Sequence, residues 1–212
     1  MSNKIDGRSR TRATTRQNIS NAATLLFFEQ GFDSVTVDEI AAAAGVGRMT
    51  VFNHFPRKED MFFDLDEQGR NILRDALQHQ DAQAHPIEAL RLLAHQLIAT
   101  RSPFVDFSDM SQRYIATIDG SAVLKARARA IRDELAQVVA EALCKCAGHE
   151  PSDPAATLAA SMLLAIWAVA FMHAHHTYRQ TQDTHAANAA FLTIVDQGTV
   201  GVKAAMSGTP YV

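Results

Sequence analysis

The stretch TVDEIAAAAGVGRMTVFNHFPRK, residues 36–58, decides the fold of this chain. Thr36 and Glu39 have the T-x-x-E spacing of a capping box, which predicts that a short helix begins directly after Thr36. Gly45 suits the positive φ of a tight turn, and a second short helix is expected to end before Pro56, because helices tend to stop before proline. Two short helices joined by a glycine-containing turn form a helix-turn-helix, and the second helix has the size that enters a DNA major groove.

The longer stretch Phe32–Phe62, FDSVTVDEIAAAAGVGRMTVFNHFPRKEDMF, resembles the DNA-binding domain of the TetR family of transcriptional regulators. It combines T-V-x-x-I-A, A-G-V, a threonine–hydrophobic–aromatic step, H-F and K-E-D in one register. The resemblance implies a helix-turn-helix motif at residues 37–55 and a sequence-specific transcriptional regulator rather than an enzyme. It also implies a small-molecule effector, which we expect to release the protein from a palindromic operator. Repression is the expected default, because a protein that occupies a promoter needs no further contact with polymerase.

Three positions differ from the usual pattern of the family. Phe52 stands where the family often has a tyrosine, whose hydroxyl reaches a DNA phosphate. Gly47 stands where the N-cap of the second helix is often serine, and Arg57 where the next cap is often serine or asparagine. These differences affect individual phosphate contacts but not the predicted fold.

Apolar residues recur at helical spacing along the rest of the chain, and no run alternates apolar and polar residues for long enough to demand a strand. We therefore predict an all-α protein of about nine helices. A three-helix DNA-binding domain is followed by a helical ligand-binding and dimerisation domain. The predicted parts are a flexible basic arm at 1–13, the DNA-binding domain at 14–60, the helical body at 61–205 and a tail at 206–212.

Capping signals predict three further helix boundaries. Thr14 and Gln17 form a second capping box, so the first helix is expected to begin at Thr14. The helix after the motif is expected to run without a break from about Lys58 to Gln78. Thr184 is expected to cap the last helix.

The formal net charge of −3 looks unsuited to a DNA-binding protein, but the charge is unevenly distributed. Residues 1–20 carry five basic side chains and one acidic one, whereas the chain from residue 61 onward carries 12 basic and 16 acidic ones. Basic residues concentrated at one end of an acidic protein are typical of a chain that contacts DNA phosphates with that end.

The side chains that leave the apolar face of the second helix are the predicted DNA contacts. An arginine suits guanine, an asparagine suits adenine, and a methionine or threonine suits a thymine methyl group. Residues at helix ends suit phosphates, by their position and by the resemblance to the family. The base-facing candidates are Arg48, Met49, Thr50 and Asn53, the phosphate-facing candidates are Thr36, His54 and Lys58, and Phe52 completes the set. The alternative for each is a solvated surface side chain.

One small DNA-binding domain, or head, contacts too few base pairs to bind an operator tightly. We therefore predict a homodimer on a palindrome of double-stranded DNA. The last two helices carry more apolar surface than one core needs, and their small residues allow close approach. The predicted dimer contacts are Ser161, Ala165, Ala168, Phe191, Val195 and Gly198. The alternative is that these residues form the internal core of one subunit.

The family resemblance further implies a small hydrophobic or aromatic effector, bound inside the body. Aromatic, methionine and histidine side chains of the body are the candidates to line such a site. They are Phe104, Phe107, Met110, Tyr114, Met162, Trp167, Phe171 and His175. The alternative is that the aromatic and methionine residues are ordinary core.

Metal, cofactor and membrane contacts are not expected. His173 and His176 have i, i+3 spacing but lack a nearby carboxylate or cysteine partner. The uncharged residues 155–178 are long enough to span a bilayer, yet they are rich in alanine and lack a flanking basic cluster, so we expect a cytoplasmic protein. Two alternatives stay open: a membrane-anchored regulator, and a small-molecule-binding or enzymatic helical protein with a vestigial DNA-binding head.

Overall fold

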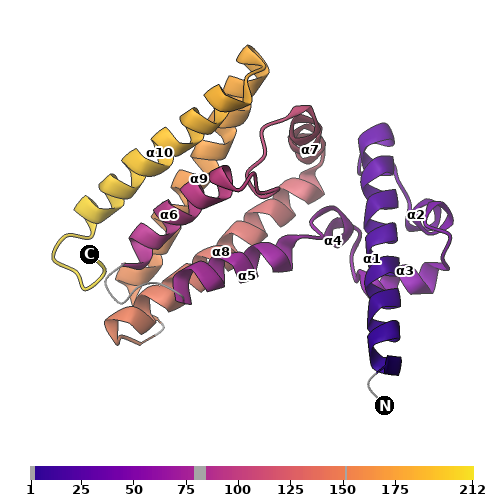
Figure 1. Cartoon of the computed structure of the whole chain (residues 1–212), viewed down its shortest axis with the longest axis horizontal. Helices are drawn as coiled ribbons and strands as arrows, with labels where there is room; N and C mark the ends of the chain where they lie inside the picture. Colours follow the sequence, from indigo (N-terminus) through magenta and orange to yellow (C-terminus); the bar gives the residue numbers. More distant parts are fainter. Residues whose placement is uncertain (1–2, 79–84, 151) are drawn as a thin grey trace. The chain divides into compact units, whose positions relative to one another are not determined.

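A computed structural model describes residues 3–78, 85–150 and 152–212, and these residues contain ten α-helices and no strand (Figure 1). The predicted all-α class is confirmed. The helices are α1 (Asn3–Gln30), α2 (Val37–Ala43), α3 (Arg48–His54), α4 (Lys58–Phe62), α5 (Asp66–Gln78), α6 (Pro86–Ala99), α7 (Asp109–Gly120), α8 (Ala122–Ala147), α9 (Pro154–Thr181) and α10 (Thr184–Ala205).

The chain divides into two compact units. Unit 1 consists of Met1–Leu65 and Arg113–Ala128, and unit 2 consists of Asp66–Gln112 and Arg129–Val212. Helices α7 and α8 therefore each contribute residues to both units. Each unit has its own hydrophobic core.

The core of unit 1 forms where α1 packs against α2, α3 and α4. Phe27 of α1, Ile40 of α2 and Val51 of α3 are completely or almost completely buried there. Phe55 and Met61 close the same core after α3 and within α4. Each such side chain stabilises the fold by about 1.5–3 kcal/mol, so the short helices of the motif depend on packing for their stability.

Residues 113–128 also belong to the core of unit 1, although the sequence placed them in the body. The ring of Tyr114 stacks on Phe62 with centroids 4.3 Å apart. The Ser121 hydroxyl donates to a carboxylate oxygen of Asp33 at 2.8 Å. Packing partners this distant in sequence are not visible in local patterns, which is why the predicted boundary at residue 60 missed them.

The first helix begins at Asn3, well before the predicted start at Thr14. The Thr14 hydroxyl donates to the Arg10 carbonyl at 3.0 Å, and the amide of Gln17 bonds to Asn21 at 2.9 Å. Thr14 thus satisfies its hydroxyl inside a helix rather than capping one. The predicted flexible arm is therefore helical from Asn3 onward, and its first two residues lie outside the described part of the chain.

The predicted helix from Lys58 to Gln78 is divided into α4 and α5. Phe63 leaves the helical conformation, with φ −99° and ψ 41°. Its ring packs edge-on against Phe62 at 5.3 Å and against Tyr114 at 6.2 Å. Aromatic packing within unit 1 therefore accompanies a break that the apolar spacing alone did not reveal.

The N-cap of α10 is Asp183 rather than the predicted Thr184. The Asp183 carboxylate accepts a hydrogen bond from the backbone N–H of His185 at 2.7 Å. The Thr184 hydroxyl instead donates to the Phe107 carbonyl at 3.0 Å. A carboxylate is as effective a cap as a hydroxyl, and here the neighbouring threonine has a tertiary partner.

Within unit 2, α9 and α10 pack side by side along their length (Figure 1). A Cβ atom added at Gly198 of α10 would lie 2.5 Å from Cγ2 of Ile166 on α9. Real Cβ atoms do not approach so closely, so the glycine permits the Ile166 side chain to pack on the backbone of α10. The small side chain at this position therefore serves packing inside one subunit.

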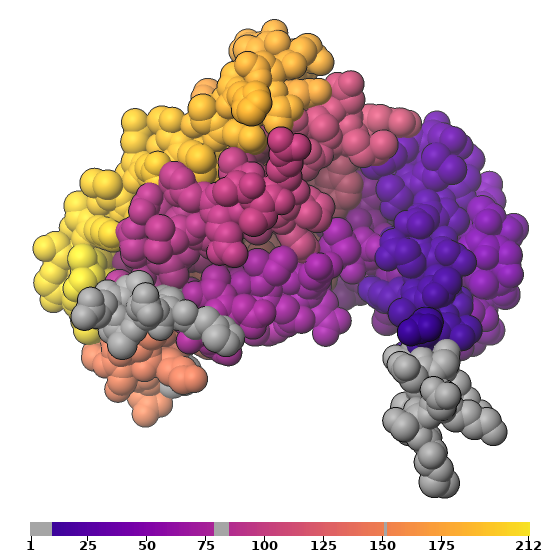
Figure 2. All heavy atoms as spheres, in the orientation of Figure 1, coloured from indigo at the N-terminus to yellow at the C-terminus, as the bar shows by residue number. Residues whose placement is uncertain are grey.

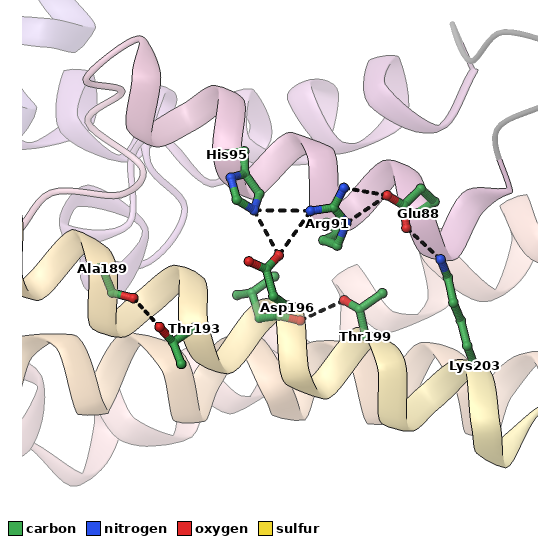
Figure 3. A network of polar contacts seen from close by, with 9 residues as sticks. Glu88, Arg91, His95, Ala189, Thr193, Asp196, Thr199 and Lys203 are labelled. Atoms are coloured by element: carbon green, nitrogen blue, oxygen red, sulfur yellow. Dashed lines mark hydrogen bonds and ion pairs between the residues drawn. The ribbon is translucent and has the colours of Figure 1, made fainter.

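A row of charged and polar side chains joins α6 to α10 (Figure 3). The Lys203 ammonium lies 2.6 Å from Glu88, which also pairs with Arg91 at 2.6 Å. Oδ1 of Asp196 lies 3.1 Å from Nη1 of Arg91 and 2.8 Å from Nε2 of His95. The space-filling view shows the segments of α6 and α10 side by side (Figure 2).

The C-terminal residues fold back onto unit 2 instead of forming a separate tail. Tyr211 is completely buried, and its hydroxyl donates to Asp153 at 2.7 Å. Asp153 is also the N-cap of α9, where it accepts from the N–H of Ala155 at 2.8 Å. The predicted tail is therefore anchored to the core of unit 2 through Met206 and Tyr211.

Helix α9 is long and apolar enough to cross a membrane by length and composition, with a hydropathy of 2.0 in its most apolar 18-residue window. About a quarter of that window, 28%, is buried. The buried side consists largely of alanines that pack in the core of unit 2. Core helices of soluble proteins have the same length and composition.

Candidate nucleic-acid interface

The start of α2 is fixed by the predicted capping box. The backbone N–H of Glu39 donates to the Thr36 hydroxyl oxygen at 3.3 Å, and the Thr36 N–H donates to the Glu39 carboxylate at 2.7 Å. This backbone hydrogen bond lowers the pKa of Glu39. The Thr36 hydroxyl also donates to Glu39 at 2.7 Å, so Thr36 sets the helix start while its side chain stays at the surface.

The turn between α2 and α3 depends on Gly45, which has a φ of +65°. Side chains are strained in this region, whereas glycine adopts it freely. The N–H of the next residue, Val46, donates to the Ala41 carbonyl at 3.0 Å and closes the turn. Helix α3 then begins at Arg48, as the sequence predicted.

Helix α3 has a buried face and an outward face. Val51 is completely buried, as is Phe55 directly after the helix. Arg48, Met49 and Asn53 are exposed on the other side, and Met49 has 70% of its surface accessible. The remaining candidates of this helix are half-buried, namely Thr50, Phe52 and His54.

Lys58 is less available to a phosphate than the sequence predicted. Its ammonium donates to the carbonyls of Phe32 at 2.7 Å and Val35 at 2.8 Å, and it lies 4.3 Å from the Phe32 ring centroid. Burial lowers the pKa of Lys58. An ammonium has three N–H donors, and two of those of Lys58 are used by these carbonyls.

Sequence reasoning missed the structural role of Arg16. Its guanidinium donates to the His54 carbonyl at 2.7 Å and lies 4.0 Å from the Phe55 ring centroid, so a cation stabilises the C-terminal end of α3. Burial lowers the pKa of His54, and the charges of Arg12 and Arg16 add to this effect. The signal was present, because Arg16 lies three residues before Ile19 and therefore on the buried face of α1.

Asp38 is a second missed residue of this surface. Its carboxylate lies 2.6 Å from the Arg48 guanidinium, and both side chains remain more than half exposed. The guanidinium also lies 5.5 Å from the Phe52 ring centroid. The principal base-reading candidate is thus held in place by neighbours from both helices of the motif.

The predicted effector residues are only partly brought together. In unit 2, Phe107 contacts both Phe171 and the buried His175, with ring centroids 6.1 Å and 5.1 Å apart, respectively. Trp167 joins the cluster through Phe171 at 6.3 Å. Met162 is partly buried against the same core.

Three effector candidates lie elsewhere. Tyr114 is in the core of unit 1, where it stacks on Phe62. Met110 is 57% exposed. Phe104 packs on Gly69 of α5, where an added Cβ would lie 3.1 Å from its ring.

The polar partners of His175 are well defined. Its carbonyl accepts a hydrogen bond from the Gln112 amide at 2.8 Å, and the same amide lies 3.2 Å from its Nδ1. Burial lowers the pKa of His175. The ring is therefore neutral at pH 7, and Nδ1 is the acceptor in this contact.

The predicted dimer residues divide into two groups. Phe191 and Val195 are completely buried within the subunit, and Gly198 packs against Ile166, so they follow the alternative of an internal core. Ser161 and Ala165 are exposed and Ala168 is half-buried. The same outer side of α9 carries the exposed apolar residues Leu158, Val169 and Met172.

Comparisons with known proteins agree with this geometry. Residues 19–65 match the family model described as "Bacterial regulatory proteins, tetR family". The HTH-type transcriptional regulator AcrR of Shigella flexneri is 39% identical over 89 residues, which cover 41% of each chain. The chain thus matches less than half of the length of this curated relative.

Solved structures extend the similarity to the whole fold. SmeT, whose structure is a complex with triclosan, is the repressor of a multidrug efflux pump of Stenotrophomonas maltophilia. It has a TM-score of 0.57 and 20% identity, with 94% of this chain and 95% of SmeT covered. The TetR-family repressor FadR of Thermus thermophilus, in complex with lauroyl-CoA, has a TM-score of 0.56 and 24% identity, with 88% and 92% covered. Residues 19–65 of this chain thus match the N-terminal domain of the TetR family, and the whole chain has the fold of these solved structures.

Proposed function

We propose that this protein is a transcriptional repressor that binds a palindromic operator as a homodimer and leaves it when a small molecule binds unit 2. The observation that carries the proposal is the outward face of α3. Arg48, Met49 and Asn53 are exposed there on a helix whose opposite face is buried in the head. Exposed side chains on a rigid recognition helix are what base reading in a major groove requires.

The side chains of this face divide by chemistry. Arg48 suits a bidentate contact with guanine and Asn53 one with adenine. Met49 and Thr50 suit a thymine methyl group. Phosphate contacts then fall to side chains at the edges of the motif, which are Thr36, His54 and the remaining donor of Lys58.

The outer side of α9 supports the homodimer. It presents Leu158, Val169 and Met172, each more than half exposed, beside the small residues Ser161 and Ala165. Exposed apolar side chains at helical spacing are typical of a surface that a partner covers. A second copy of this chain is the partner that a palindromic operator requires.

The aromatic cluster of unit 2 supports a hydrophobic or aromatic effector. Phe107, Trp167 and Phe171 offer apolar contacts, and the neutral His175 ring with Gln112 offers hydrogen-bonding groups. Two proteins of similar fold are complexes with compounds that carry a large apolar part, SmeT with the aromatic triclosan and FadR with lauroyl-CoA, whose acyl chain is apolar. An effector releases DNA only if it binds the non-binding conformation more tightly.

Selection of binding sites from random DNA tests the proposal. The purified full-length protein is expected to select a palindrome whose half-sites lie about one DNA turn apart, ~34 Å. Binding should weaken steeply with salt, because it releases counterions from phosphates. Purified protein that shows no salt-sensitive, sequence-selective binding would exclude the function and favour a small-molecule-binding or enzymatic role.

The hydropathy of α9 favours one alternative, a membrane-anchored regulator. Membrane fractionation of cells that express the protein separates the two. We expect the protein in the soluble cytoplasmic fraction, because a side of α9 is already covered by the core of unit 2. Recovery in the membrane fraction after a high-salt wash would support the anchored form.

A further inference from the structure

Asp38 and Arg48 form an ion pair between the two helices of the helix-turn-helix. Nη1 of Arg48 lies 2.6 Å from Oδ2 of Asp38. Asp38 belongs to the first turn of α2 and Arg48 begins α3, so the pair connects the N-terminal turns of both helices. The side chains are 56% exposed for Arg48 and 63% for Asp38.

The exposure of this pair makes a purely structural role a weak explanation. Exposed ion pairs contribute little to folding, because water and salt screen them and two side chains lose freedom. A carboxylate beside the recognition helix also repels phosphates and so opposes the binding of any DNA. Asp38 is therefore expected to lower DNA affinity, while its ion pair with Arg48 adds little to stability.

Phe52 restrains the same guanidinium from a second side. Its ring centroid lies 5.5 Å from Cζ of Arg48, within the range of a cation–π contact. Phe52 follows Arg48 by four residues, which places the two side chains on one face of α3. A guanidinium held by a carboxylate and by a ring has lost much of its freedom before DNA arrives, which lowers the ordering cost of binding.

We propose that Asp38 is a positioning residue that sets base specificity through Arg48. The ion pair engages Nη1, whereas a guanidinium has five N–H donors, so donors remain for O6 and N7 of a guanine. Asp38 also offsets part of the charge of Arg48, which weakens its attraction to phosphates relative to its base contact. The inference rests on the proposed DNA-binding function, which it deepens by naming what orients the base-reading side chain.

The test compares wild-type protein with Asp38→Asn, which keeps the size of the side chain and removes its charge. Binding sites are first selected from random DNA. Affinity is then measured at one salt concentration for three DNAs: the selected site, the same site with the Arg48-dependent guanine replaced, and random DNA. We expect Asp38→Asn to bind random DNA more tightly. Its discrimination for that guanine should fall roughly fivefold to tenfold, at the lower end of the range that one bidentate contact supplies.

Three further variants separate positioning from charge. Glu29→Gln removes one negative charge from another exposed position of unit 1, and it is expected to leave the discrimination unchanged. Asp38→Glu restores the carboxylate and is expected to restore most of the discrimination. In an Arg48→Ala background, Asp38→Asn is expected to cause no further loss, because a residue that acts through another has no effect once that residue is gone.

Several results would overturn the inference. The first is that Asp38→Asn leaves the discrimination for the guanine unchanged. The second is that Asp38→Asn, like Glu29→Gln, changes the affinity for every DNA sequence by the same factor. The third is that Asp38→Asn lowers the discrimination further in the Arg48→Ala background. Asp38→Ser, which suits a helix start, replaces Asp38→Asn if that variant does not fold. Wild-type protein without any selective binding would refute the proposed function itself, whereas selective wild-type protein with an indifferent Asp38 would refute only this inference.

Discussion

Lys58 directs its ammonium group into the loop before α2. It donates to the carbonyls of Phe32 and Val35 and lies over the Phe32 ring. Lys58→Met keeps the apolar stem but leaves these acceptors without a donor, and an unsatisfied acceptor costs about 1–3 kcal/mol. We expect this substitution to lower the free energy of unfolding by about 1–3 kcal/mol, measured by urea denaturation.

A second lysine of unit 1 provides the matched control at the residue scale. Lys125 also donates to a backbone carbonyl, that of Asp119 at 3.2 Å, but this hydrogen bond is exposed, whereas those of Lys58 are partly buried. Lys125→Met is expected to change the free energy of unfolding by less than about 0.5 kcal/mol. If both variants lost the same free energy of unfolding, the partial burial of the Lys58 hydrogen bonds would contribute nothing to stability.

The outward side chains of α3 were predictable because a short helix with a buried face has its remaining residues outside. Their restraints were not predictable. The Asp38–Arg48 pair spans ten positions of sequence and depends on the turn geometry, and the Lys58 contacts depend on where the loop carbonyls point. Local patterns reveal which residues are available, whereas tertiary contacts decide how each one is held.

At the scale of elements, predictability depended on how local the cause was. The capping box of α2 and the end of α3 follow from neighbouring residues, and both were predicted correctly. The start of α1 was wrong because T-x-x-Q also fits the interior of a helix. The break between α4 and α5 was missed because Phe63 packs against Tyr114, which is distant in sequence.

The contact between α7 and α9 predicts a pH dependence of stability. Burial lowers the pKa of His175 below its ordinary value of 6.5, so the unfolded chain binds more protons than the folded one between the two values. Stability from this group is complete above about pH 6.5 and is lost as the pH falls toward the folded pKa. His175→Gln removes the titration and keeps an acceptor for Gln112.

Urea denaturation between pH 5 and pH 8 measures this effect. We expect the stability difference between wild type and His175→Gln to shrink as the pH falls, because only the wild type loses stability from this ring. His173→Gln, an exposed histidine of the same helix, is the control and should leave the pH profile of the wild type unchanged. A difference that stays constant across this range would contradict the assigned burial effect.

At the scale of the whole molecule, the proposed function requires two DNA-binding domains on one operator. A single head has few base contacts, whereas two linked heads gain affinity because the second binding event is intramolecular. The proposed dimer surface is the outer side of α9, which belongs to unit 2 and not to the DNA-binding domain. Operator affinity should therefore depend on residues that contact no DNA.

Val169 tests this dependence, because it is 59% exposed on the outer side of α9. Val169→Glu would bury a charge at the proposed interface, which is strongly unfavourable without a partner. We expect a monomer in sedimentation experiments and an operator affinity at least about tenfold lower, since avidity is lost. Leu92→Glu places the same charge at an exposed position of α6 and should leave both properties unchanged. If Val169→Glu stayed dimeric with full operator affinity, the dimer surface would have to lie elsewhere on the molecule.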